Sequence, residues 1–554
     1  MKIIRQYMRQ ENRKVNNNQN NQGTRLYQVT QIGVTLYLLL ILGGLPLFCY
    51  DGFYRIGDMK YQFFYFISIV CIPFLLFLLL LPKINIIAKR LQSKDWKPRI
   101  QERLSACDCC MILYGLVVLL SYGMSPYREI ALYGYPDWHM GVVTQLLLIG
   151  IYLCISRGWR WKEQFLWYAV AVSGLIFLLG LLNRYAYDPL GMYGGLEYWN
   201  KTHLLATIGN INWYCGYVCI LLPIGFYYYW SVKSGKLRIL LSFYICVAFG
   251  TMLTQGSESG LVAMAVMLCC YFFFSFASTD KMRRFLQALV LLGVTSLLLR
   301  LAYAILQDRA YFGQDLAIVG IVTSNLWIGY TIVVSFLSLG YEFLVYQGGF
   351  CIANYGKLRK GILISAITCV VILVAAMLLH RQNPEFLPGL TQNTYLQLNA
   401  DWGSGRGLLW PLTWRAWCEM PWLQKLFGVG ADCYAPYMYA HYGEGLQGFL
   451  QGWWGDAIVA NAHNEWLNTL ITEGLLGLLT YLGTLLTGMI TALRYHKKEP
   501  VLIGLFMSVM LYAVNTTASF QHVMAVPFLF VFLGMIENRR KNYVYDIDCD
   551  SMLQ

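Results

Sequence analysis

Apolar runs of about 20 residues recur along this 554-residue chain from residue 31 to residue 536. Each run is long enough to cross the hydrocarbon core of a bilayer as a helix. The composition agrees, because 57% of the residues are hydrophobic and only 13% are charged, against about 25% charged residues in soluble domains. The sequence therefore predicts an all-α, polytopic membrane protein, and it excludes a soluble enzyme or a soluble domain on a single anchor.

The apolar runs and their polar flanks define fourteen predicted transmembrane helices. Their boundaries are uncertain by several residues, because boundaries are the least reliable part of such a prediction. The predicted helices cover residues 31–50, 61–82, 105–122, 139–156, 163–182, 212–230, 237–254, 260–276, 285–306, 326–346, 361–380, 466–493, 501–517 and 523–536.

Lys and Arg are unequally divided between the two sides that these helices define. One set of alternate loops, with both termini, holds 31 of them, and the opposite set holds 10. Because positive loops stay in the cytoplasm, this division predicts that both termini are cytoplasmic. The predicted parts are a polar tail (1–30), helices 1 to 11 (31–380), a large extracytoplasmic loop (381–465), helices 12 to 14 (466–538) and a second tail (539–554).

Neither the net charge nor the cysteines indicate a further partner. The charge of +13 follows the membrane topology, so we expect no nucleic acid. Most of the sixteen cysteines lie in apolar runs, where a thiol behaves as a small hydrophobe. Cys107, Cys109 and Cys110 begin a predicted membrane helix without a second ligand pair, so we expect no metal and no cofactor. Cys418 and Cys433 lie in the large loop, and their redox state is left open.

The large loop is rich in aromatic residues and glycine and poor in charge. Trp and Tyr concentrate at membrane interfaces, so the loop could rest on the bilayer surface. The same side chains could instead stack against the apolar faces of sugar rings, and composition does not separate these two interpretations. The residues concerned are Trp402, Trp410, Trp414, Trp417, Trp422, Trp453, Trp454, Tyr434, Tyr437, Tyr439 and Tyr442.

Two arginines of this loop are candidates for binding a phosphate group. Arg406 lies in the sequence Gly403-Ser404-Gly405-Arg406-Gly407, and Arg415 follows on a predicted helix. Arginine binds phosphate oxygens through a planar fork and keeps its charge, which suits a diphosphate as its negative charge develops. The alternative for each is an arginine that contacts only water or lipid headgroups.

The end of the large loop carries a histidine at the start of a membrane helix. His463 is followed by Asn464, and Glu473 lies further along the same helix. A neutral histidine can accept a proton from a hydroxyl group, although His463 could also serve only as a helix cap. Glu473 would lie at membrane depth, where a carboxylate is costly unless paired. It is therefore either a helix-packing residue or part of the wall of a site.

A second outer loop, residues 183–211, ends in Gly209-Asn210-Ile211-Asn212. Asparagine at the start of a helix commonly caps backbone N–H groups. Asn210 and Asn212 are therefore either capping residues or binding residues.

Taken in order, these motifs resemble those of the O-antigen ligase and O-antigen polymerase superfamily. No single motif is specific, but their order, spacing and shared outer side together are. The resemblance covers about residues 125–536. It rests on Gly209-Asn210-Ile211-Asn212 with Gly216-Tyr217 and Pro223, Gly405-Arg406 with Trp410, Gly428-Val429-Gly430, Ala462-His463-Asn464, and Glu473-Gly474-Leu475-Leu476-Gly477.

The resemblance implies a metal-independent glycosyltransferase of the C-type fold class in a bacterial cytoplasmic membrane. Such an enzyme moves a glycan from an undecaprenyl diphosphate carrier to an acceptor hydroxyl on the outer face. The acceptor would be a glycan, a lipid or a cell-wall polymer. Arg406 would then stabilise the diphosphate, and His463 would activate or orient the acceptor. Asn210, Asn212, Trp410, Arg415, Asn464 and Glu473 would contribute to substrate binding.

One motif of the superfamily is missing. Where its members often carry a second arginine in a Ser-Arg-small motif, this chain has Thr254-Gln255-Gly256-Ser257-Glu258-Ser259-Gly260. Arg300, in the outer half of a predicted helix, could supply the charge or reach the membrane surface instead. Arg184, Lys201 and His203 are further candidates.

Two other functions are compatible with parts of this pattern. A transporter or flippase of lipid-linked glycans also needs a lipid groove and aromatic contacts, but transporters commonly show inverted repeats, and none is evident here. A protein O-oligosaccharyltransferase would share the outer loop and use a protein hydroxyl. The residues themselves do not identify the acceptor.

Overall fold

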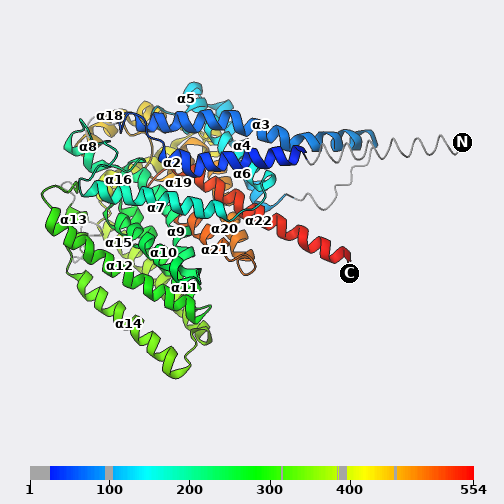
Figure 1. The fold of residues 1–554 in the computed structure, drawn as a ribbon. Helices are drawn as coiled ribbons and strands as arrows, with labels where there is room; N and C mark the ends of the chain where they lie inside the picture. The colour runs from blue at the N-terminus through cyan, green and yellow to red at the C-terminus, as the bar shows by residue number, and fades with distance from the viewer. Residues whose placement is uncertain are drawn as a thin grey trace.

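The computed structural model describes residues 25–93, 104–312, 316–383, 385, 396–454 and 458–553. Figure 1 shows that these residues form a helical bundle. Ten helices of the described part are long and apolar enough to cross a membrane, which confirms a polytopic helical membrane protein. Thirteen of the fourteen predicted segments fall on one helix each, although α6 and α21 have only 17 and 14 residues. The segment 466–493 is divided at Glu473 into two helices, α19 and α20. The number of crossings stays a prediction.

The first half of the bundle begins with the helix Arg25–Leu47, which includes the π-turn Leu40–Gly44 (η1) and the short α2 (Leu45–Leu47). Two short strands, β1 (Leu204–Leu205) and β2 (Gly209–Asn210), pair in antiparallel fashion before α9. The helices are α3 (Ile56–Ser93), α4 (Ala106–Met124), α5 (Arg128–Tyr133), α6 (Val142–Gly158), α7 (Gln164–Arg184), α8 (Tyr198–His203), α9 (Ile211–Ser231), α10 (Gly235–Thr254), α11 (Glu258–Ser275) and α12 (Thr279–Leu306).

The second half includes three helices, α16 to α18, inside the segment 381–465 that was predicted as one large loop. Its last helix, α22, continues through residues 539–553, which were predicted as a tail. The elements are α13 (Leu316–Thr323), α14 (Leu326–Gly348), the 3-10 turn η3 (Ile352–Tyr355), α15 (Gly356–Gln382), α16 (Trp402–Glu419), α17 (Trp422–Phe427), α18 (Tyr434–Trp454), α19 (Glu465–Thr472), α20 (Gly474–Tyr495), α21 (Leu502–Asn515) and α22 (Val526–Leu553).

The helix α9 forms the centre of the bundle. Every residue from Trp213 to Trp230 is buried, and α9 packs against α7, α10, α11 and α21. A helix that is apolar on all sides is expected in such a position. In contrast, α14 and α15 are apolar but largely exposed, and Figure 1 shows α14 at the edge of the molecule. Exposed apolar surface of this kind suits contact with lipid.

The two ends of the bundle are named here after the predicted topology, which stays a prediction. Toward one end of the bundle, Figure 1 shows α8, α16 and α18, and toward the other it shows the C-terminal end of α22. We call the first the outer end and the second the inner end, after the predicted topology. At the outer end, the buried Lys60 side chain donates to three backbone oxygens, those of Leu45, Pro46 and Phe48. It thereby caps the C-terminus of the first helix.

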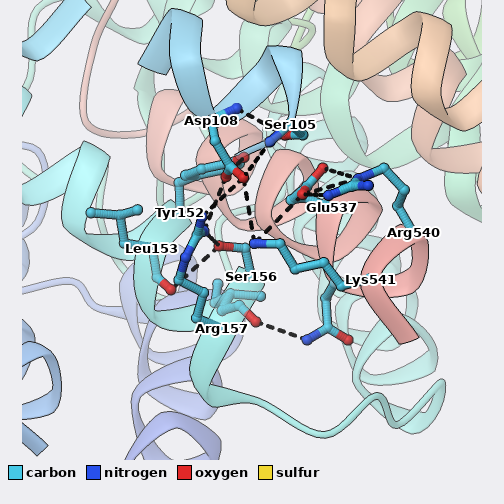
Figure 2. Close-up of polar contacts among 11 residues, drawn as sticks. Ser105, Asp108, Tyr152, Leu153, Ser156, Arg157, Glu537, Arg540 and Lys541 are labelled. Atoms are coloured by element: carbon cyan, nitrogen blue, oxygen red, sulfur yellow. Dashed lines mark hydrogen bonds and ion pairs between the residues drawn. The ribbon is translucent and has the colours of Figure 1, made fainter. Parts of the chain in front are cut away.

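The inner end is held by a buried ion-pair network across α4, α6 and α22 (Figure 2). Asp108 is fully buried, and its carboxylate receives both Nη atoms of Arg157 at 2.9 and 3.0 Å. The Tyr152 hydroxyl also donates to it, at 2.7 Å. The Lys541 Nζ of α22 lies 3.6 Å from Asp108 and 3.5 Å from Glu537. A buried carboxylate of this kind is tolerated because its partners compensate its desolvation.

We expect Asp108→Asn to destabilise the folded protein by about 3–5 kcal/mol, because it removes the buried carboxylate that pairs with the half-buried Arg157. The midpoint of thermal unfolding of the purified protein in detergent would measure this. Asp280→Asn is the matched control, since Asp280 is 77% exposed and pairs with Arg283 at the start of α12. Exposed pairs contribute little. Equal midpoints for the two variants would show that the network does not hold the inner end.

Candidate functional site

Arg406 follows a sharp kink near the start of α16. Gly403, Ser404 and Gly405 have φ values of 61°, 58° and 89°, a left-handed conformation that favours glycine. The kink turns the chain so that the Arg406 Nη1 donates to the Gly403 oxygen at 2.6 Å. Its Nε is buried and has no hydrogen-bond partner among the described residues. The guanidinium therefore keeps binding capacity for a ligand.

His463 lies in a turn that is tied to the segment between α21 and α22. Its φ is 46°, and its backbone N–H donates to the Asn461 side chain at 2.9 Å. Asn464 caps α19 by accepting from the Leu467 N–H at 3.0 Å, and its own amide donates to the Thr517 oxygen at 2.9 Å. Asn464 thus has the structural role of a helix cap. It fixes the position of the histidine that precedes it.

Charge effects place Arg406, His463 and Glu258 in one neighbourhood. Burial lowers the pKa of His463 well below its usual value, and the positive charge of Arg406 lowers it further. Burial also lowers the pKa of Arg406, while the carboxylate of Glu258 opposes this effect. His463 is therefore neutral at ordinary pH, and Arg406 is flanked by a carboxylate and a neutral imidazole.

The aromatic residues of α16 lie on both sides of Arg406 in the sequence. The indole rings of Trp402 and Trp410 meet edge to face, with their centroids 5.4 Å apart. The Nε1 of Trp410 is buried and has no hydrogen-bond partner in the described part of the chain. Trp410 can therefore offer an N–H group, as well as an apolar surface, to a ligand near Arg406.

Asn210 has the structural role of a cap, whereas Asn212 is only positioned by it. The Asn210 side chain accepts from the Asn212 N–H at 2.8 Å and begins α9. One residue later, the ring of Trp213 lies 6.1 Å from that of His522. The start of α9 therefore lies beside the segment that also positions His463. No contact of the Asn212 side chain bears on its predicted role in substrate binding.

Of the four cations proposed to replace the missing arginine, Arg184 reaches the segment Thr254–Gly260. Arg184 is 1% exposed, and its Nη2 donates to the Gln255 oxygen at 2.7 Å. Its Nη1 donates to the oxygens of Thr202 and Tyr311 at 2.8 and 3.0 Å. This guanidinium thus joins three outer segments next to the helix that carries Glu258.

The other predicted cations lie in different surroundings. Arg300 is partly exposed on α12, and its buried Nη1 has no hydrogen-bond partner among the described residues. Arg415 is 70% exposed and pairs with Glu419 at 2.8 Å, so the structure does not bring it to Arg406. Cys418 and Cys433 are both free thiols, one exposed and one buried.

The glycine motifs form a tight junction below His463. The N–H groups of Val429 and Gly430 donate to the oxygens of Ile471 and Thr472 at 3.1 and 2.9 Å. A Cβ atom at Gly428 would lie only 2.2 Å from the Thr472 oxygen, so no other residue fits there. Glu473 ends α19 at this junction, is 4% exposed and accepts from the Thr472 hydroxyl.

Three buried carboxyl groups share one small polar cavity near this junction. The cavity measures about 20 Å³, enough for about one water molecule. Burial raises the pKa of Glu465 to about 8 and that of Asp432 to about 6. In the described residues, no group of three or more His, Cys, Asp or Glu side chains could hold a metal ion. The lining residues are Trp138, Met140, Gln145, Asp432, Asn461, Glu465, Asn468, Thr469, Glu473, Phe520 and Gln521.

The raised pKa of Glu465 predicts a pH-dependent stability. Between its ordinary pKa of 4.5 and about 8, the folded protein keeps a proton that the unfolded chain releases. The free energy of unfolding therefore falls as the pH rises through this range. We expect Glu465→Gln to reduce this fall, measured as the difference between thermal midpoints at pH 5 and pH 8.5. Glu419→Gln, at an exposed site, should keep the wild-type difference. If Glu465→Gln also keeps it, Glu465 is ionised when folded.

Sequence reasoning singled out Arg406 and His463 but missed Glu258, Glu465 and Asp432 as neighbours of the site. Glu258 was part of a motif noted only for lacking an arginine. Asp432 follows the Gly428-Val429-Gly430 motif, and its carboxylate receives the Met140 N–H, 292 residues away, at 2.9 Å. The spacing of residues along the sequence gives no signal for a pairing between such distant residues.

Residues 323–482 match a protein family described as O-Antigen ligase. This range extends from α13 into α20 and contains both Arg406 and His463. No curated protein matches the chain. The family match agrees with the motifs of the sequence and with the helical membrane fold. The match over residues 323–482 supports the resemblance to the O-antigen ligase and O-antigen polymerase superfamily, and with it a role in ligating or polymerising glycans at a membrane.

Proposed function

We propose that this protein transfers a glycan from a polyprenyl diphosphate carrier to an acceptor hydroxyl at the outer face of a bacterial cytoplasmic membrane. The main support is the neighbourhood of Arg406 and His463, in which a guanidinium with an unpaired Nε lies close to a neutral imidazole. Such a pair suits a reaction that produces an anion and consumes a hydroxyl group.

Arg406 has the role of binding the diphosphate. As the bond between the sugar and the diphosphate breaks, negative charge develops on the phosphate oxygens. A guanidinium stabilises this charge through two parallel N–H groups. The proposed reaction includes no step at a metal ion. Arg184 donates to the segment Thr254–Gly260, which contains Glu258, the carboxylate near Arg406. Arg184 contributes a second positive charge. The polyprenyl chain of the donor stays in the bilayer.

His463 has the role of orienting the acceptor. The low pKa keeps its imidazole neutral, so the ring can accept a hydrogen bond from the acceptor hydroxyl. Trp402 and Trp410 provide an aromatic surface beside Arg406, against which the apolar face of a sugar ring can pack.

The test compares glycans from cells with and without this protein, on gels that separate lipid-linked from acceptor-linked material. Loss of a ladder in favour of single lipid-linked repeats would identify a polymerase. A full ladder that stays on the lipid carrier would identify a ligase, and loss of glycan from proteins alone would identify a protein glycosyltransferase. Lipid-linked glycan that fails to reach the outer leaflet would contradict the proposal and favour a flippase.

A further inference from the structure

A second histidine at the outer end, His139, is paired with a carboxylate. Its Nε2 lies 2.8 Å from the Asp58 Oδ1 at the start of α3. The other oxygen of Asp58 receives the Nε and Nη2 of Arg55 at 3.0 and 2.7 Å. Since Asp58 holds the Nε2 proton, the Nδ1 of His139 is left to accept a proton. The side chains of His139 and Asp58 are 22% and 13% exposed, so water and polar ligands can reach them.

The imidazole of His139 is held in a fixed orientation. The ring of Tyr61 stacks on it, with centroids 4.1 Å apart and an angle of 10° between the planes. The backbone at His139 is left-handed, with φ of 53°. Its N–H donates to the Tyr135 oxygen at 2.9 Å, and its oxygen accepts from the Thr144 hydroxyl at 2.6 Å. These contacts already restrict the motion of His139, so it loses little further freedom when it binds a substrate.

The pair borders the aromatic cluster that also contains His463. Trp138, next to His139, meets the ring of Phe520 edge to face at 4.6 Å. Phe520 in turn meets the ring of His463 at 5.1 Å. The two histidines therefore approach the same cluster from different segments of the outer end.

The groups closest to Arg406 are poorly suited to take up a proton. His463 would become a cation beside a second cation, and burial already disfavours its charged form. Glu465 keeps its own proton up to a pH of about 8 because its pKa is raised to that value. The imidazolium of His139 would instead face the carboxylate of Asp58, which stabilises it.

We infer, on the basis of the proposed transfer reaction, that His139 held by Asp58 is the residue that takes the proton from the acceptor hydroxyl. The acceptor oxygen forms a bond to the anomeric carbon, and the bond from that carbon to the diphosphate oxygen breaks. The electron pair of the broken bond leaves with the diphosphate, next to Arg406. The acceptor proton passes to the Nδ1 of His139 and later to water.

The test is the pH dependence of the transfer rate in right-side-out membrane vesicles that contain the endogenous lipid-linked glycan and its acceptor. For the wild type, the rate should fall on the acid side. His139→Gln should lower the rate at neutral pH by about 100-fold and abolish this acid-side fall. Asp58→Asn should also lower the rate, because an amide in place of the carboxylate no longer holds the Nε2 proton and so no longer leaves Nδ1 free to accept one.

The interpretation of the pH profile includes the other ionisable groups near His139. These are Arg55 just before α3, Tyr61 on α3, Asp137 in the turn of His139 and Asp432 in the segment before α18. The substitution that abolishes the acid-side fall identifies the group responsible. His441→Gln is the matched control, because His441 is an outer histidine whose ring, in the described contacts, meets Tyr437 of its own helix. It should leave the rate and the pH profile unchanged.

Two outcomes overturn different parts of the argument. If Arg406→Ala stops transfer but His139→Gln keeps both the rate and the acid-side fall, then His139 is not the proton acceptor and the proposed function stands. If Arg406→Ala also transfers glycan normally, the proposed function itself fails. Should His139→Gln not accumulate in membranes, the rate of Asp58→Asn decides, and a wild-type rate in that variant contradicts the inference.

Discussion

Replacing Arg406 with alanine should lower the rate of glycan transfer by about 100- to 1000-fold, the usual loss when a preorganised donor to a developing anion is removed. The reason is that the Arg406 Nε has no hydrogen-bond partner within the described structure, so its capacity remains for the diphosphate. The variant should fold, because within the described residues this side chain donates to Gly403, three residues away, and to no distant segment. The measurement is the ratio of lipid-linked to acceptor-linked glycan at matched membrane levels.

Two further variants separate charge from geometry at this position. Arg406→Lys keeps a positive charge but loses the planar fork, so we expect it to recover only part of the lost activity. Arg415→Ala is the matched control on the same helix, because Arg415 is 70% exposed and pairs only with Glu419 in the described contacts. If Arg415→Ala loses as much activity as Arg406→Ala, the effect reflects damage to α16 rather than loss of a phosphate ligand.

The membrane helices could be predicted from the sequence because the bilayer imposes a minimum length on each apolar run. All fourteen predicted segments fall on helices for this reason. The segment 381–465 was harder, since it is stabilised by contacts with distant residues. For example, the Ser125 hydroxyl donates to the Val429 oxygen at 2.5 Å across 304 residues. Local periodicity carries no information about such a contact.

The same limit applies to the candidate site. Arg406 and His463 could be singled out because each lies in a recognisable motif. Asn210 had both a capping and a binding interpretation, and its capping contact is present in the structure. Asn464 was predicted only to bind substrate, but it caps α19. The pairing of Asp58 with His139 joins residues 81 positions apart, and neither residue lies in a motif. Their chemistry depends on the partner, which only the fold supplies.

The left-handed backbone at His463 suggests how to test its role without disturbing the loop. Asparagine adopts this conformation more readily than most other residues, so His463→Asn should keep the φ of 46° and the bond from its N–H to Asn461. We expect His463→Asn to reach the membrane at wild-type levels and to lower the transfer rate by about 100-fold or more, because the imidazole no longer orients the acceptor.

A comparison with alanine at the same position then separates chemistry from structure. If His463 acts only through the loop that it belongs to, His463→Asn should be active, and only His463→Ala, which strains a left-handed position, should lose activity. If the imidazole binds the acceptor, both variants lose activity although only the alanine variant is destabilised. His441→Asn is the matched control, because the His441 Nδ1 contacts the Tyr437 oxygen of its own helix at 2.8 Å. Since its ring has no role in our proposed reaction, a loss in His441→Asn would mean that the outer segment, rather than His463, limits transfer.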